Sequence, residues 1–111
     1  MDRLDYYRTI IRRIIAEQVE VQPAVGNVEL VPVCDDTSMN YLVVMLGWDG
    51  DDRVDAPVIH IRLRDGKVWL EEDNTDELIV NQLIDAGIPK EEIVLAFYPA
   101  SERPATEYAL A

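Results

Sequence analysis

The sequence predicts one α+β domain, in which an N-terminal helix precedes an antiparallel sheet of about four strands. Apolar residues recur every three or four positions at the start of the chain, which is the period of an amphipathic helix. From Asn27 the pattern becomes that of strands, and Asp65-Gly66 joins two of them as a hairpin. A chain of 111 residues that is 49% apolar can bury one ordinary core, so we expect a single domain over residues 1–111.

The first element is a helix over residues 2–20. Its apolar side chains form one broad stripe, made of Leu4, Tyr7, Ile10, Ile11, Ile14, Ile15 and Val19. The stripe predicts a helix that packs on the core, and a partner-binding face is the alternative. Pro23 and Gly26 end this segment.

Strands follow from Asn27 onward. Pro32 indicates that the first of them lies at a sheet edge, because proline has no N–H for a neighbouring strand. Residues 41–48 are apolar on both alternate rows, which predicts a strand covered on both faces. The chain then reverses through Asp49-Gly50-Asp51-Asp52, with a loop that we expect to be longer than two residues.

The clearest local signal is the hairpin over residues 58–72. Counting outward from Asp65-Gly66 pairs Arg64 with Lys67, Leu63 with Val68, Arg62 with Trp69, Ile61 with Leu70, and His60 with Glu71. Strand alternation predicts a core face made of Ile59, Ile61, Leu63, Val68 and Leu70. The opposite, exposed face would carry His60, Arg62, Trp69 and Glu71, with Arg62 stacked on Trp69 as a cation–π pair.

A second helix follows the hairpin. Asn74 or Thr75 would cap it, with Glu77 at capping-box spacing from Asn74 and the acids Asp76 and Glu77 in its first turn. Its apolar side would carry Leu78, Ile79, Leu83 and Ile84. Gly87 ends it, Pro89 begins a short helical turn through Ile93, and residues 94–98 could add a final short strand.

The charge of the chain is strongly acidic. It has 22 acidic and 10 basic residues, for a net charge of −12, and all of the excess lies within residues 21–111. Such a surface repels phosphates, so we expect no direct nucleic-acid binding. A basic protein partner would instead be attracted at low salt. The alternative interpretation is that the charge only keeps the protein soluble.

Few residues could support catalysis. His60 is the only histidine, and its predicted neighbour Glu71 could orient it, although such cross-strand pairs are commonly structural. Cys34 is the only cysteine, has no local base, and is expected to be a half-buried thiol in a reducing compartment. Asp49-Gly50-Asp51-Asp52 lacks the ligand spacing of a calcium loop and is expected to be a solvated turn. We therefore expect no catalytic residue, no metal site and no cofactor.

The location expected from these features is the cytoplasm. No apolar run is long enough to cross a membrane, and the charged residues near the N-terminus do not fit a signal peptide.

Several short motifs, taken in order, resemble those of the XisI family, controlling factors for excision of the fdxN element in cyanobacteria. The matching motifs are Leu4-Asp5-Tyr6-Tyr7-Arg8, Gly47-Trp48-Asp49-Gly50, His60-Ile61, Asp65-Gly66-Lys67-Val68-Trp69, Asp73-Asn74-Thr75, Gly87-Ile88-Pro89-Lys90, Ile93-Val94-Leu95, and then Phe97, Pro99 and Arg103. The resemblance spans nearly the whole chain. It implies a small α+β accessory protein, encoded beside a second factor called XisH, that supports excision by a separate recombinase. It brings no active-site residues.

The resemblance and the acid excess together favour a non-catalytic regulatory protein that binds a XisH-like partner. We expect the partner to contact the exposed hairpin face, made of His60, Arg62, Trp69 and Glu71. One alternative is a small metal-dependent hydrolase that uses His60 with nearby carboxylates. Another is direct DNA binding through the arginines of the first helix, which the overall charge disfavours. An edge strand or the apolar helix face could also support a homodimer.

Overall fold

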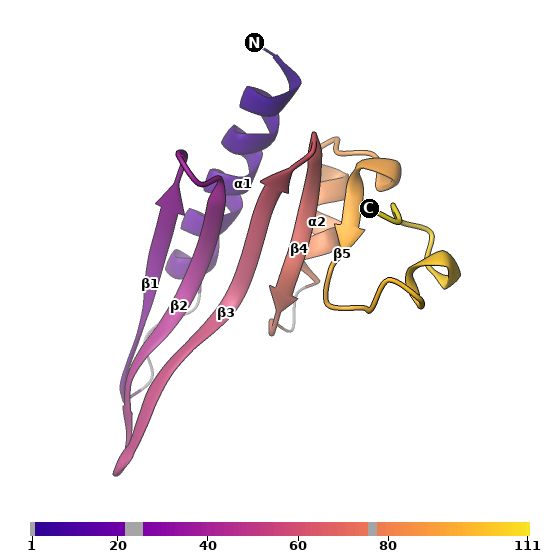
Figure 1. The fold of residues 1–111 in the computed structure, drawn as a ribbon. Coiled ribbons are helices and arrows are strands. Elements are labelled where there is room, and N and C mark those ends of the chain that lie inside the picture. The colour runs from indigo at the N-terminus through magenta and orange to yellow at the C-terminus, as the bar shows by residue number, and fades with distance from the viewer. Residues whose placement is uncertain (1, 22–25, 76–77) are drawn as a thin grey trace.

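The chain folds into two layers, a five-stranded sheet and two helices that lie on one face of it (Figure 1). The computed structural model describes residues 2–21, 26–75 and 78–111. Its elements are α1 (Arg3–Val21), β1 (Asn27–Asp35), β2 (Asn40–Asp49), β3 (Asp52–Arg64), β4 (Lys67–Asp73), α2 (Ile79–Asp85), the 3₁₀ turn η1 (Lys90–Glu92), β5 (Ile93–Leu95) and the 3₁₀ turn η2 (Arg103–Ala105). The strands lie in the order β1-β2-β3-β4-β5. The predicted α+β class is confirmed.

The sheet is mixed, not wholly antiparallel. β1 to β4 form an antiparallel meander, and β5 then lies parallel to β4 with Val68 opposite Ile93. A parallel neighbour needs a crossover connection, which the segment containing α2 supplies. The final strand is Ile93–Leu95 and not residues 94–98, because the chain turns after it, with the N–H of Tyr98 donating to Leu95 O.

The core lies between the helices and the inner face of the sheet. In α1 the predicted stripe is confirmed, with Tyr7, Ile10, Ile11, Ile14 and Ile15 buried and Leu4 and Val19 packed against them at the margin. The predicted core residues of the β3–β4 hairpin are buried too, namely Ile59, Ile61, Leu63, Val68 and Leu70. Helix and strand periodicity therefore identified both sides of the core.

Two tight turns end the long hairpins. Asp65 and Gly66 have φ of 53° and 75°, as a two-residue type I′ turn requires, which confirms the turn expected there. The expected longer loop between β2 and β3 is wrong. Asp49 still pairs with Asp52, so the loop is the dipeptide Gly50-Asp51 with Gly50 at a φ of 62°.

The strands near the N-terminus are covered on one face only. β1 is the edge strand that Pro32 predicted. The expectation that β2 is covered on both faces is wrong. Tyr41 and Val43 are buried toward the helices, whereas Leu42 and Val44 are half-exposed on the other side. The reason is that both helices lie on the same face of the sheet (Figure 1).

The start of α2 differs from the prediction. The helix begins at Ile79, too far along the chain for Asn74 or Thr75 to cap it, and Asp76 and Glu77 lie outside the described residues. The carboxylate of Asp73 takes this role from the end of β4, since its Oδ2 accepts a hydrogen bond from the N–H of Ile79 at 2.9 Å.

The end of α2 is as predicted. Gly87 has a φ of 104°, and its N–H donates to Ile84 O while the N–H of Ile88 donates to Leu83 O. This is a Schellman motif, which satisfies the last helical carbonyls. At the end of α1, Pro23 lies outside the described residues, and Gly26 has a φ of 64°.

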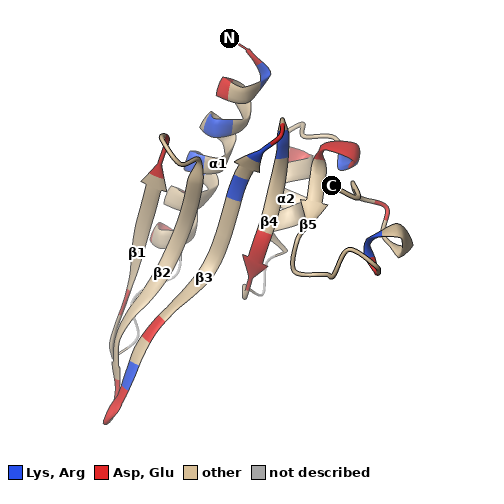
Figure 2. Cartoon of the chain, viewed as in Figure 1, with Lys and Arg blue, Asp and Glu red and all other residues tan. Residues whose placement is uncertain are grey.

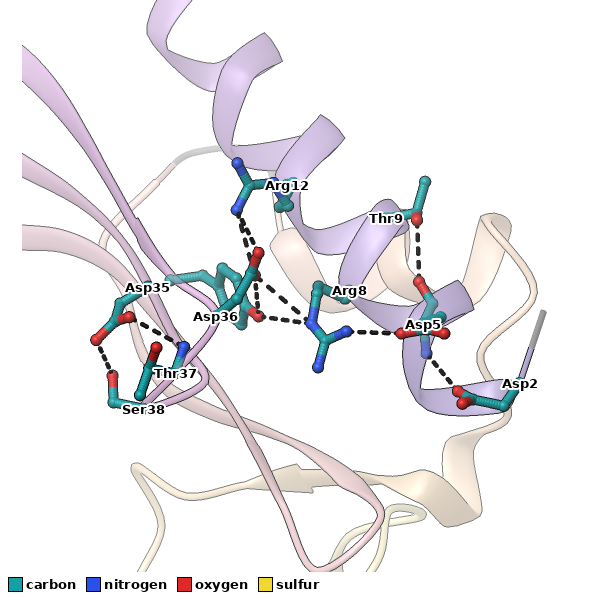
Figure 3. A network of polar contacts seen from close by, with 10 residues as sticks. Asp2, Asp5, Arg8, Thr9, Arg12, Asp35, Asp36, Thr37 and Ser38 are labelled. Carbon is teal, nitrogen blue, oxygen red and sulfur yellow. Dashed lines mark hydrogen bonds and ion pairs between the residues drawn. The ribbon is translucent and has the colours of Figure 1, made fainter.

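A polar network fixes the β1–β2 turn to α1 (Figure 3). Asp36 in the turn forms ion pairs with Arg8 at 3.5 Å and Arg12 at 3.2 Å. The carboxylate of the preceding Asp35 closes the turn on itself by accepting hydrogen bonds from Thr37 N–H and the Ser38 hydroxyl. These contacts hold the β1 and β2 ends in a fixed place against the helix.

Candidate interaction surface

The face of the sheet that carries no helix, here called the outer face, presents apolar side chains from β1 and β2. Val31 lies opposite Val44, and Val33 lies opposite Leu42, so these four residues form two adjacent rows. Val33 is 41% exposed and the other three are half-buried. The four residues do not belong to the core cluster beneath the helices or to the side chains packed against it. The rows are therefore an apolar strip that α1 and α2 leave open.

β3 extends both rows and flanks them with charge. His60 lies opposite Leu42 and Pro57 opposite Val44. One position beyond each row on the same face, Arg62 lies opposite Asn40 and Asp55 lies opposite Leu46. Along β3, the outer face therefore presents the acid Asp55, then Pro57 and His60 in the two apolar rows, and then the base Arg62.

His60 lies in this face as a hydrogen-bonded side chain. Its Nε2 is 2.8 Å from Oδ1 of Asn40. Partial burial lowers the pKa of His60, against the opposing effect of the Glu71 carboxylate. The hydrogen-bond partner of His60 is thus an amide, and not the carboxylate expected to orient it.

The predicted pairing of His60 with Glu71 is wrong. The register shifts between His60 and Ile61, so His60 lies opposite Glu72 while the hairpin pairs nearer the turn are as predicted. Such a shift is a β-bulge, which local counting from the turn does not reveal. Glu71 instead accepts a 2.9 Å hydrogen bond from Nε of Arg62.

Trp69 is not exposed as predicted. Only 8% of it is accessible, and its indole N–H donates to Arg64 O at 3.0 Å. Arg62 does lie opposite Trp69 in the strand register, but it is bound to Glu71. The guanidinium groups over the indole ring are those of Arg64, at 5.1 Å from the centroid, and Arg103, at 5.5 Å. The expected Arg62–Trp69 stack is therefore replaced by stacking with two other arginines.

The cover over Trp69 comes from the C-terminal segment, residues 96–111. The N–H of Ala109 donates to Ile93 O at 2.9 Å, which ties the segment to the outer edge of β5. Arg103 donates to Leu110 O, and Lys90 forms a 2.7 Å ion pair with Glu107. Of the four predicted surface residues, His60, Arg62 and Glu71 remain half-exposed, and Trp69 lies beneath this segment.

The described residues offer little for bond-making chemistry. Across residues 2–21, 26–75 and 78–111, no three or more His, Cys, Asp or Glu side chains are grouped so as to hold a metal ion. Cys34 is half-buried, as predicted, and burial raises the pKa of its thiol. A raised pKa makes the reactive thiolate rarer at neutral pH.

Charge is separated along the sheet (Figure 2). Acidic residues gather at the tip of the β2–β3 hairpin and at the C-terminal end of β4, and basic residues gather near the β3–β4 turn.

None of the described helices is both long and apolar enough to span a bilayer.

The apolar rows of β1 and β2 were not assigned as a surface from the sequence. The signal was present, because residues 41–48 are apolar at every second position on both faces. The same pattern is typical of a strand buried on both sides, and only the placement of both helices on one face shows that one of its rows is open.

Comparison with known proteins gives a consistent result. The model of the XisI protein family matches residues 1–110. A XisI-like protein from Anabaena variabilis ATCC 29413, known from a crystal structure, is 28% identical with a TM-score of 0.93, covering 98% of this chain and 100% of that one. The fdxN element excision controlling factor XisI from the same organism is 35% identical with a TM-score of 0.89, covering 99% and 100%. No curated protein matches the chain.

Proposed function

Because this chain belongs to the XisI family, we propose that it is a non-catalytic accessory protein of a site-specific DNA excision system. In this proposal it acts by binding a second protein that resembles XisH. The solved relative with the greater identity is described as an excision controlling factor, which supports a regulatory role.

The observation that carries the proposal is the open apolar strip on the outer face. Val31, Val33, Leu42 and Val44 lie side by side on strands that no helix covers. Contiguous apolar surface of this kind, bordered by polar residues, is typical of protein-binding sites. His60, Arg62 and Glu71 adjoin it and supply the polar border.

Electrostatics favours a basic protein partner over DNA. The net charge of −12 opposes approach to a phosphate backbone. Acidic side chains at the β2–β3 tip would attract basic groups on a protein that docks beside them (Figure 2). DNA contact in such a system would then come from the partner or the recombinase.

No specific observation favours the hydrolase alternative. His60 pairs with the amide of Asn40, and its burial lowers its pKa. The carboxylate that was expected to orient it is bound to Arg62 instead.

The test is complex formation with a purified XisH-like protein, measured by calorimetry at several salt concentrations. We expect binding at low salt that weakens as salt increases. Val33→Asp, which places a charge in the apolar strip, should weaken binding at least tenfold. Ala16→Asp is the matched control, because it adds the same charge at an exposed position of α1 and should bind like the original protein.

Two results would contradict the proposal. Absence of a complex at low ionic strength would exclude direct binding of the partner. Equal binding by Val33→Asp and Ala16→Asp would leave the partner role intact but would move it away from the outer face. Thermal unfolding of both variants checks that the fold is retained.

A further inference from the structure

We infer that a second copy of this chain packs on the outer face, with the strands of the two copies running in opposite directions. The apolar strip of each copy then covers that of the other. This inference goes beyond the proposed function and does not depend on a XisH-like partner.

The order of side chains along β3 carries the inference. On the outer face β3 presents Asp55, Pro57, His60 and Arg62, and Pro57 and His60 belong to the two apolar rows. Asp55 lies two residues before the first row, and Arg62 lies two residues after the second. At about 3.3 Å per residue, each charged residue lies about 7 Å along the strand from the apolar row nearest to it.

When one copy is reversed against another, this order of side chains is complementary to itself. Each acid then faces a base, and the apolar rows face each other. A two-fold axis that lies in the interface, across the strands and between the two rows, places Asp55 of one copy over Arg62 of the other, and the reverse. It also places Val44 over Leu42, and Val31 over Val33. Every favourable contact therefore occurs twice, as a symmetric dimer interface requires.

Charge disfavours the arrangement in which the strands of the two copies run parallel over β3. An axis along β3 would place Asp55 over Asp55 and Arg62 over Arg62, and like charges brought together in an interface oppose association. Since each copy carries a net charge of −12, self-association needs local complementarity of this kind. On β1 the proposed axis places Glu29 of one copy over Asp35 of the other. Both lie at the sheet edge and are exposed, so solvent screens this like-charge contact.

One consequence concerns the protein partner. A second copy would cover the same strip and His60, so self-association and partner binding on this face would compete. Added partner should then convert dimers into mixed complexes.

The first experiment measures the mass of the full chain in solution by sedimentation velocity over a wide range of concentrations. We expect a dimer, and Val44→Asp should raise the dimer dissociation constant at least tenfold. Ala16→Asp should leave it unchanged. A chain that stays monomeric at the highest concentration, or a dimer unaffected by Val44→Asp, would overturn the inference.

The second experiment tests the orientation by charge reversal in a Glu71→Gln background, which removes the carboxylate that binds Arg62 within each copy. In this background Asp55→Arg alone and Arg62→Glu alone should each weaken the dimer at least fivefold, because each places like charges in contact. The double variant Asp55→Arg/Arg62→Glu should restore dimerisation to within about threefold of the Glu71→Gln protein. Failure of the double variant to recover, while both single variants weaken the dimer and remain folded, would overturn the proposed orientation.

These results are distinguishable from those of the proposed function. The double variant restores contacts between copies but not contacts with an unchanged partner. Recovery of the dimer without recovery of partner binding would support both proposals. Absence of partner binding by the original chain, with the dimer behaving as described, would contradict only the proposed function.

Discussion

The hydroxyl of Tyr41 donates a 2.8 Å hydrogen bond to Oδ1 of Asp36, although Tyr41 as a whole is 0% exposed. The same phenol oxygen accepts a 3.3 Å hydrogen bond from Nε of Arg8. A core residue of β2 is thereby joined to the β1–β2 turn and to α1. The Tyr41 hydroxyl thus links the turn to the helix through two hydrogen bonds.

Tyr41→Phe should lower the free energy of unfolding by about 1 kcal/mol, the usual net worth of one or two such hydrogen bonds. The ring would still fill its place in the core, so no cavity adds to the loss. Chemical denaturation with tryptophan fluorescence measures the change. Tyr98→Phe, at a 41% exposed position, is the control and should change stability by less than about 0.5 kcal/mol. Equal effects of the two changes would mean that the Tyr41 hydroxyl contributes nothing to stability.

Gly47 lies on β2, where the backbone of β1 leaves no room for a side chain. A Cβ at this position would lie 1.9 Å from Asn27 O and 2.7 Å from the Cα of Val28, and its φ is 151°. Gly47→Ala should therefore destabilise the protein by about 3 kcal/mol or more, since backbone atoms have to move.

Gly50 provides the matched control for that change. Its φ of 62° also disfavours a side chain, but a Cβ there would meet nothing within 4 Å. Gly50→Ala should cost only about 1–2 kcal/mol, from the backbone conformation alone. Thermal or urea unfolding of the two variants separates the effect of the steric clash from that of the backbone conformation. Equal losses of unfolding free energy would show that the clash of a Cβ at Gly47 with β1 does not destabilise the protein.

Local patterns predicted the parts of the fold that local physics decides. The stripe of α1 follows from helical spacing, and the Asp65-Gly66 turn follows from two residues that accept positive φ. Pairing near that turn was correct, because register is set by the turn itself.

The errors arose where distant parts of the chain meet. The bulge between His60 and Ile61 changes the partner of His60 without any signal near the turn. Trp69 is buried by a segment that includes Arg103, more than thirty residues later in the chain. Three of the four residues predicted for the partner surface are therefore half-exposed, and Trp69 is buried.

Arg103 should control the environment of Trp69. It lies over the indole ring at 5.5 Å and also donates hydrogen bonds to Tyr98 O and Leu110 O, so it holds the C-terminal segment in place. In a Trp48→Phe background, which leaves Trp69 as the only indole, Arg103→Ala should shift the fluorescence emission to longer wavelength and increase quenching by acrylamide. Water would then reach a ring that is now 8% exposed.

A second arginine gives the control for this measurement. Arg53 stacks at 5.5 Å on Trp48, far along the β2–β3 hairpin, and not on Trp69. In the same Trp48→Phe background, Arg53→Ala should leave the emission unchanged. An unchanged spectrum for Arg103→Ala as well would mean that the other contacts of the segment keep Trp69 covered without it.

His60 should titrate below the usual histidine value of about 6.5, because partial burial disfavours its charged form. The unfolded chain binds this proton more readily than the folded one, so protonation of His60 favours unfolding. The folded state keeps its full stability above about pH 6.5 and loses part of it as the pH falls below that value, until the pH passes the folded pKa. The only histidine of the chain gives a single set of ring resonances, so NMR reads its pKa directly.

His60→Gln separates this effect from the titration of the many carboxylates. The amide does not titrate and can still reach Asn40, whereas the carboxylates are common to both proteins. The difference in unfolding free energy between the original chain and His60→Gln should therefore shift against the original chain between about pH 7 and pH 5. A difference that stays constant, or a measured pKa at or above about 6.5, would show that charging His60 costs the fold nothing. The imidazole would then be free to become cationic beside Arg62, and the outer face would gain positive charge on acidification.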